Sequence, residues 1–121
     1  MGKKTEILAN RLIKAFDAFS SNEAIFDGIQ HFLYSDLSLL SSKIASSIAL
    51  HKNDDRPVAI LGKKSFYTYA GICGTLFASR AYMPLNMRFP LARNLKMISL
   101  SGAGIMVADS HSGQMLKMIL D

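Results

Sequence analysis

The sequence predicts an α/β fold: a parallel sheet of successive βα units with flanking helices and a small N-terminal β-hairpin. Three short apolar runs support this prediction, because they begin at Val58, Ala81 and Gly104, at equal intervals of 23 residues. Each run is followed by a segment whose apolar residues recur at helical spacing. Strands that alternate with helices are typical of a parallel sheet, whose right-handed crossovers place the helices against the strands.

The first element is an amphipathic helix from about residue 5 to residue 19. Its apolar residues recur at helical spacing and lie on one face, which must pack against another part of the molecule. These residues are Leu8, Leu12, Ala15, Phe16 and Phe19. The polar segment 20–22 then ends the pattern.

A small hairpin is expected over about residues 23–34. Asp27 and Gly28 form a pair that favours a two-residue turn with positive φ, and apolar residues flank the pair on both sides. The two strands are therefore predicted at residues 24–26 and 29–34.

A second helix is expected over residues 35–50, with Ser35 as a suitable N-cap. The apolar residues on one side of this helix are Leu37, Leu40, Ile44 and Ile48. Serines occupy the other sides, and the apolar period runs through them unbroken. The segment therefore predicts a helix rather than a flexible linker.

Three βα units follow, over residues 58–120. The strands are expected at 58–61, 81–85 and 104–108, and the helices at 65–79, 90–100 and 110–120. The first strand is apolar throughout, which suits a strand covered on both faces. Pro90 suits the first turn of its helix, and Gly102 suits the turn that follows. No linker-like segment separates the two halves, so residues 1–121 are expected to form one structural unit.

Composition limits the class of protein. The 121 residues are 50% hydrophobic, which is enough to build a globular core. Cys73 is the only cysteine, so the sequence contains no disulfide framework. A single cysteine favours a reducing compartment, and the cytoplasm is the expected location.

Neither nucleic acid nor a membrane is an expected partner. The net charge is +5, but the cations are spread along the sequence without a basic run or interleaved aromatic residues. The longest apolar run, residues 65–79, is shorter than the roughly 18 residues that a membrane-spanning helix needs.

Two glycine-containing segments resemble phosphate-binding motifs but lack their defining residues. Gly62–Ser65 lies between a strand and a helix, where amides and two lysines could hold a phosphate. The P-loop pattern fails there, because Pro57 stands where its first glycine belongs and Lys64 displaces the hydroxyl residue. Gly102 and Gly104 precede their strand and lack a third glycine. A solvated strand-to-helix turn is the favoured interpretation of Gly62–Ser65.

Gly71, Gly74 and Cys73 lie in one apolar helix and favour structural roles. The two glycines are three residues apart, which indicates close packing against a neighbouring backbone. Cys73 has no histidine or cation beside it in the sequence and is interpreted as a small buried apolar residue.

The histidines and the acidic loop do not form a recognisable site. His31, His51 and His111 are widely spaced and lack partners at metal-ligand spacing. Asp54 and Asp55 are interpreted as carboxylates that keep a polar loop solvated. We therefore predict no catalytic, cofactor-binding or metal-ligating residue in this sequence.

One stretch carries a family signature. Leu76–Asn86, which reads LFASRAYMPLN, resembles the helix-to-strand passage of the adenylate-forming ligases, enzymes that activate a carboxylate with ATP. Further blocks resemble that family in the expected order, from about Glu23 to Asp109. These blocks are Phe32–Leu37, Val58–Leu61 with Lys64–Ser65, Pro90 with Arg93, and Ser101–Asp109.

The sequence departs from the family pattern outside the family's catalytic positions. Ser79 replaces a glycine, and Asn86 stands where amino-acid-activating members usually have aspartate. Ala81–Tyr82 resembles the amino-acid-activating members that load carrier proteins, whereas Leu85–Asn86 resembles acyl-CoA synthetases. The first of these subclasses is preferred.

The resemblance implies that the chain is the N-terminal scaffold, a partial N-terminal subdomain, of such a ligase. In the family, a carboxylate and ATP give acyl-AMP and pyrophosphate, and the acyl group then passes to a thiol of a carrier protein or CoA. ATP and Mg²⁺ are the implied cofactors of the complete enzyme, and none is expected in this chain. The family's phosphate loop and catalytic lysine come later than these blocks, so residues 1–121 alone are expected to be inactive.

A second hypothesis is a non-catalytic binding or self-assembly module that retains the fold. A partial parallel sheet leaves strand edges and apolar helix faces that favour pairing with another chain. The expected partners are a second copy of the chain or the missing remainder of the enzyme.

Overall fold

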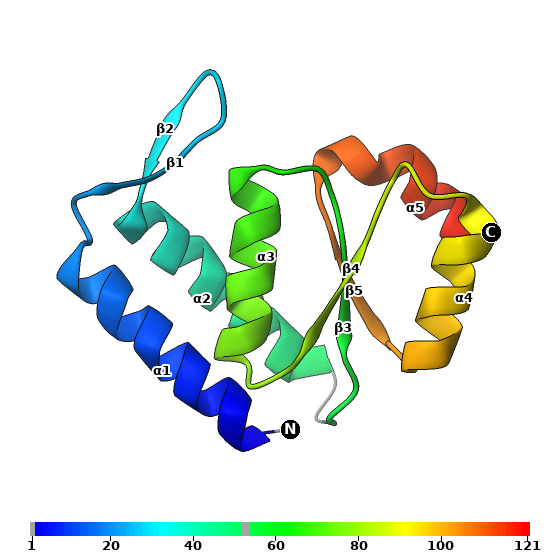
Figure 1. Ribbon diagram of the computed structural model, residues 1–121, viewed down its shortest axis with the longest axis horizontal. Helices are drawn as coiled ribbons and strands as arrows, with labels where there is room; N and C mark the ends of the chain where they lie inside the picture. The colour runs from blue at the N-terminus through cyan, green and yellow to red at the C-terminus, as the bar shows by residue number, and fades with distance from the viewer. Residues whose placement is uncertain (1, 52–53) are drawn as a thin grey trace.

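The computed structural model describes residues 2–51 and 54–121, with side chains from Ile7 onward in the first helix (Figure 1). It contains a two-stranded antiparallel sheet, β1–β2, and a three-stranded parallel sheet in the order β4–β3–β5. The elements are α1 Gly2–Ala18, β1 Glu23–Phe26, β2 His31–Leu33, α2 Tyr34–His51, β3 Val58–Leu61, α3 Phe66–Phe77, β4 Tyr82–Leu85, α4 Leu91–Ser101, β5 Ile105–Ala108, the 3₁₀ turn η1 Ser110–Ser112 and α5 Gly113–Leu120.

The predicted α/β fold is confirmed. All three βα units are present, and their strands pair in parallel. From β3 the chain crosses to β4 on one side, and from β4 it returns past β3 to β5 on the other side. Because the two crossovers run in opposite directions, a common hand requires their helices to lie on opposite faces. Figure 1 shows this arrangement, with α2 and α3 on one side of the sheet and α4 and α5 on the other.

The central strand β3 is buried along its whole length, as predicted for a strand covered on both faces. Val58 and Ile60 pack with Ile48 and other residues of the α2 and α3 side. Ala59 and Leu61 pack with Leu85, Met115 and residues of α4 and α5. The alternation of a strand therefore divides this core into two layers.

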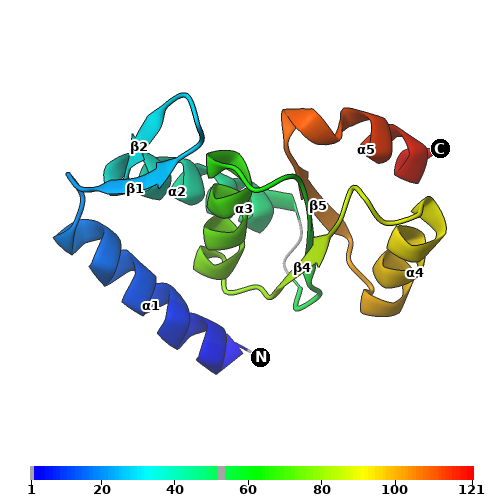
Figure 2. The ribbon, with the colours of Figure 1, turned by 45° about the horizontal axis from the view of Figure 1, so that its top comes forward.

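A third cluster joins α1 and the hairpin to α2 and α3. Its buried members are Phe16, Phe32, Leu37, Phe66 and Ala70. The rings of Phe32 in β2 and Phe66 in α3 stack with centroids 3.9 Å apart. Figure 2 shows the hairpin lying across the ends of α2 and α3, where this stack holds it.

The predicted two-residue hairpin turn is wrong. Phe26 pairs with His31, so the loop has four residues, Asp27–Gln30. The Asp27 carboxylate accepts hydrogen bonds from the backbone N–H groups of Ile29 and Gln30, at 3.0 and 2.8 Å. These two hydrogen bonds close a loop that is longer than predicted. Gly28 has the expected positive φ, at 98°.

Several helix ends differ from the prediction by a residue or more. α2 begins at Tyr34, and the carboxylate of Asp36 accepts from the Leu33 N–H at 2.8 Å, so Ser35 lies inside the helix. Pro90 is the N-cap of α4 rather than its first turn. α5, the helix of the third βα unit, starts at Gly113, three residues later than predicted, because Asp109 caps the 3₁₀ turn that precedes it.

Candidate functional site at the carboxyl edge of the sheet

Three loops meet where the parallel strands end. They follow β3, β4 and β5 and cover residues 62–65, 86–90 and 109–112. Figure 1 places all three at the upper edge of the sheet. In open α/β sheets, ligands bind outside the carboxyl ends of the strands where the crossover direction reverses. This edge is therefore the place in the fold to test for a site.

Asp109 ties two of these loops together. Its Oδ2 accepts from the Lys63 N–H at 3.1 Å and from the Thr68 hydroxyl at 3.4 Å. Its Oδ1 accepts from the His111 N–H at 3.1 Å and from the Ser112 hydroxyl at 2.6 Å. The chain's own carboxylate therefore occupies the position that an anion would take at the β3–α3 turn.

Gly62 is required by this contact. A Cβ atom there would lie 2.4 Å from the Thr68 Oγ1 and 2.8 Å from the Asp109 Oδ2. The Ser65 hydroxyl is also engaged, because it caps α3 by accepting from the Thr68 N–H. The Lys63 N–H and the Ser65 hydroxyl of the turn Gly62–Ser65 are thus already bonded within the protein.

The inner side of the β3–α3 turn does not fit a nucleotide phosphate, and the described residues do not fit Mg²⁺. The turn amide of Lys63 that would face a phosphate is bonded to Asp109. In the part of the chain that the structure describes, no group of three or more His, Cys, Asp or Glu side chains could hold a metal ion. We therefore assign no step of ATP chemistry to residues of this chain.

A cavity of about 560 Å³ opens on the outer side of the same turn. Its lining comes from the β3–α3 turn and the β4–α4 loop: Gly62, Lys63, Lys64, Leu85, Asn86, Met87 and Arg88. Asn94 in α4 fixes the second loop, because its Nδ2 donates to the backbone carbonyl of Asn86 at 2.9 Å. Its side chain is fully buried, and its Oδ1 has no partner among the described residues.

The amino edge of the sheet carries a charged cluster. The Arg80 side chain is buried, and it donates from Nε to the Arg56 carbonyl at 2.7 Å and from Nη2 to Asp54 at 3.1 Å. Hydrogen bonds from Arg56 lower the pKa of the Asp54 carboxyl. Interpreting Asp54 as merely solvating the loop is wrong, because it fastens the segment before β3 to the start of β4.

The glycine and cysteine candidates lie in α3. The predicted packing against a neighbouring backbone is confirmed at Gly74, where an added Cβ atom would lie 2.8 Å from the backbone carbonyl oxygen of Ser41. At Gly71 the predicted backbone contact is wrong, because an added Cβ atom would meet the side chain of Val107 at 3.0 Å. Cys73 packs against the third cluster, which joins α1 and the hairpin to α2 and α3. Burial raises the pKa of its thiol to about 11.

The three histidines lie on separate elements. His31 in β2 pairs with Glu23 and stacks on Phe26, with ring centroids 4.3 Å apart. The His51 ring contacts the carbonyl of Ser47 one turn earlier in α2. His111 is exposed in η1.

Comparison with known proteins decides the family. Residues 14–120 match the family described as AMP-binding enzyme, which is most of the chain. The chain belongs to the AMP-binding enzyme family. Its fold, a three-stranded parallel sheet with flanking helices and a small hairpin, is that of the N-terminal subdomain of adenylate-forming enzymes.

Individual relatives agree with this family assignment. The D-alanine--D-alanyl carrier protein ligase of Bacillus velezensis is 30% identical over 101 residues, which are 81% of this chain and 20% of that protein. The crystal structure of IdnL7 has a TM-score of 0.85 and 28% identity, over 93% of this chain and 23% of that one. The N-terminal subdomain of Klebsiella oxytoca NpsA has a TM-score of 0.73 and 20% identity, over 84% and 27%. The chain thus spans about a fifth of the length of the Bacillus velezensis ligase and a smaller share of other curated relatives.

In residues 2–51 and 54–121, no helix combines the length and apolar character needed to cross a bilayer.

Proposed function

We propose that this chain is the N-terminal scaffold of an ATP-dependent adenylate-forming ligase. The observation that carries the proposal is the match to the AMP-binding enzyme family over residues 14–120, on a fold that superimposes on family members. The scaffold supplies a parallel sheet with a buried central strand, and Asp109 and Asn94 hold the loops at its carboxyl edge in place. The cytoplasm is the proposed location, which a single free cysteine supports.

The complete enzyme is proposed to convert a carboxylate and ATP to acyl-AMP and pyrophosphate and to transfer the acyl group to a thiol. ATP and Mg²⁺ are its proposed cofactors, held by residues outside the described segment. An amino acid and a carrier protein are the preferred substrate and acceptor, supported by the name of the Bacillus velezensis relative and by Ala81–Tyr82. CoA is the alternative acceptor, which Leu85–Asn86 supports.

Substrate-dependent exchange of labelled pyrophosphate into ATP tests the proposal. Residues 1–121 alone are expected to give the rate of a heat-denatured control with every amino acid tried. The reason is that Asp109 fills the β3–α3 turn, where Lys63 and Lys64 would otherwise offer a site to a phosphate. Exchange above that control would contradict the proposal. As a positive test, this chain should replace the matching fifth of the D-alanine--D-alanyl carrier protein ligase and retain D-alanine-dependent exchange. A chimera that folds but gives no exchange would count against a scaffold role.

The second candidate is a self-assembly module, and the free edge of β5 favours it. All four residues Ile105–Ala108 are half-buried, and none is charged or proline. The opposite edge strand, β4, contains Pro84, which blunts strand pairing. Sedimentation velocity at micromolar concentration decides between the candidates: self-association supports the module, and a folded monomer argues against it.

A further inference from the structure

The net positive charge of this protein comes entirely from its second half. Residues 1–57 contain seven Lys or Arg and seven Asp or Glu, whereas residues 58–121 contain seven and two. Between Asp55 and Asp109 no carboxylate occurs at all. The cations are spread evenly along the sequence, which argued against a basic site. The carboxylates are not, so the net charge differs strongly between the two halves.

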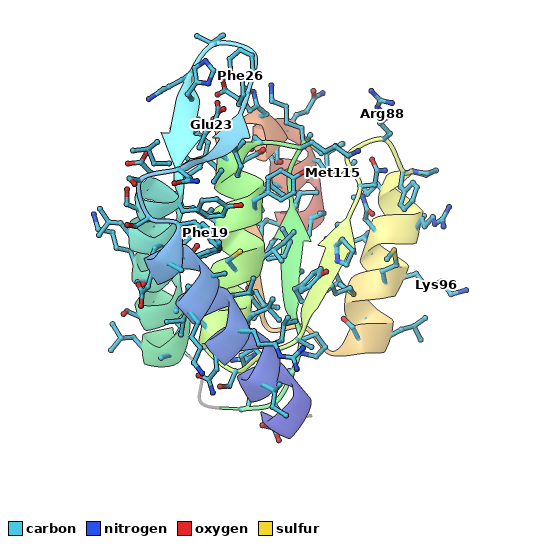
Figure 3. The ribbon with its side chains drawn as sticks, turned by 60° about the vertical axis from the view of Figure 1, so that its left-hand side comes forward. Phe19, Glu23, Phe26, Arg88, Lys96 and Met115 are labelled. Atoms are coloured by element: carbon cyan, nitrogen blue, oxygen red, sulfur yellow. The ribbon has the colours of Figure 1, made fainter. Side chains whose placement is uncertain are left out.

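The fold gathers most of these cations on one face. We define the basic face as five exposed side chains, Lys63, Lys64, Arg88, Arg93 and Lys96. The first three line the 560 Å³ cavity at the carboxyl edge, and the last two continue from it along α4. In Figure 3, Arg88 projects upward from the loop before α4, and Lys96 projects outward from the helix itself.

These cations are not neutralised from within the described chain. Lys63, Lys64, Arg88 and Lys96 make no ion pair or side-chain hydrogen bond there. Arg93 lies over the ring of Phe89, with its guanidinium carbon 3.9 Å from the centroid. A concentration of unpaired like charges is unfavourable for an isolated domain and favours a partner of opposite sign.

Asp109 and Asp27, the two carboxylates that interact with Lys63, do not balance the basic face. Both oxygens of Asp109 are occupied by donors of its own loops. Asp27 sits in the hairpin loop, where hydrogen bonds from Gln30 and Ile29 dominate the lowering of its pKa and the charge of Lys63 adds only a small part. Five cations thus remain available to an external partner.

We propose that the basic face docks a protein partner through a carboxylate-rich surface. The cations extend beyond the cavity and along a helix, so they match an extended acidic surface better than one small anion. They do not form a continuous row, and Arg93 lies over the ring of Phe89, where it competes with a stacking base of single-stranded nucleic acid. This inference goes beyond the proposed function, because it requires no ATP chemistry.

The test uses residues 1–121 and a short poly-L-glutamate peptide as the acidic probe. Amide chemical shifts of the unaltered protein should change at the five residues of the basic face. The triple variant Lys63→Gln, Lys64→Gln, Arg88→Gln should bind the peptide about tenfold more weakly. The matched control Arg11→Gln, Lys14→Gln, Lys43→Gln removes the same charge from α1 and α2 and should change the affinity less than twofold. Circular dichroism verifies that both variants are folded.

Four results would overturn the proposal. They are no binding of the peptide, shift changes centred elsewhere, equal losses in the two triple variants, and binding of duplex DNA or inorganic pyrophosphate as tight as that of the peptide at the same salt concentration. The last result would assign the face to nucleic acid or to a small phosphate ligand. Failure of the pyrophosphate-exchange tests would leave this docking result unaffected, so the two proposals fail separately.

Discussion

The two faces of β3 are packed in different ways. On the α2 and α3 side, Val58 and Ile60 meet β-branched residues. Gly74 of α3 lies against the backbone of α2 at Ser41. On the α4 and α5 side, Ala59 and Leu61 meet a layer that contains five of the seven methionines in the sequence. These are Met83, Met87, Met97, Met106 and Met115.

This difference predicts different tolerance to change. Backbone contact through glycine leaves no room for an added carbon, whereas methionine is flexible and fills irregular gaps. The α2 and α3 side is therefore expected to set the geometry of the scaffold. Cavities of about 540 and 410 Å³ lie beside β5 on that side as well, so its close packing is local to the contact between α2 and α3. The methionine-rich layer on the α4 and α5 side can adapt more readily.

The largest expected effect comes from adding one carbon on the close-packed side. A Cβ atom at Gly74 would lie 2.8 Å from the Ile44 side chain and 2.8 Å from the backbone carbonyl of Ser41. Because a backbone atom cannot swing aside, Gly74→Ala should lower the free energy of unfolding by about 2–3 kcal/mol. Urea denaturation followed by circular dichroism measures this loss.

The matched control adds the same carbon on the other side of the sheet. Gly113 begins α5, and a Cβ atom there would meet nothing within 4 Å. Gly113→Ala should therefore stabilise the protein by about 0.5–1 kcal/mol through helix propensity. Equal effects at the two glycines would break the comparison between the two faces.

A smaller effect is expected where the covering helices end. α3 is followed by Ser79 at φ 59°, a left-handed conformation that a side chain disfavours, whereas α4 ends at Gly102 with φ 74°. Ser79→Gly should raise the free energy of unfolding by about 1 kcal/mol, because glycine relieves the left-handed strain. The same denaturation experiment measures the gain.

The opposite substitution at the end of α4 is the control. Gly102→Ala places a side chain in a left-handed position and should cost about 1 kcal/mol. Stabilisation at Ser79 together with destabilisation at Gly102 would confirm that backbone conformation controls both helix ends. A neutral Ser79→Gly variant would show that the strain at α3 is compensated elsewhere.

The regular part of the fold could be predicted because its signals are local. Each strand and helix of the βα units carries its own apolar pattern, and the interval of 23 residues repeats. The predicted backbone contact at Gly74 also follows from local spacing. The sequence shows that Ser79 replaces a glycine of the family pattern. Its positive φ is seen only in the structure.

The contacts that shape the carboxyl and amino edges could not be predicted, because they join distant residues. Asp109 contacts Lys63 across 46 positions, and Arg80 contacts Asp54 across 26. Asn94 is polar and lies in a helix, which predicts exposure, yet it is fully buried and holds the Asn86 carbonyl. Sequence periodicity contains no information about such side-chain bonds.

The reactivity of a side chain on the close-packed side can be measured without any substitution. Cys73 lies in α3, and burial raises the pKa of its thiol from 9.0 to about 11. Since only the thiolate reacts, the native protein at pH 8 should be alkylated by iodoacetamide about 100-fold more slowly than the unfolded chain in guanidinium chloride. Mass spectrometry of quenched samples follows the reaction. Equal rates in native and unfolded protein would mean that α2 and α3 open freely at this position, and the contrast between a rigid and an adaptable face would then fail.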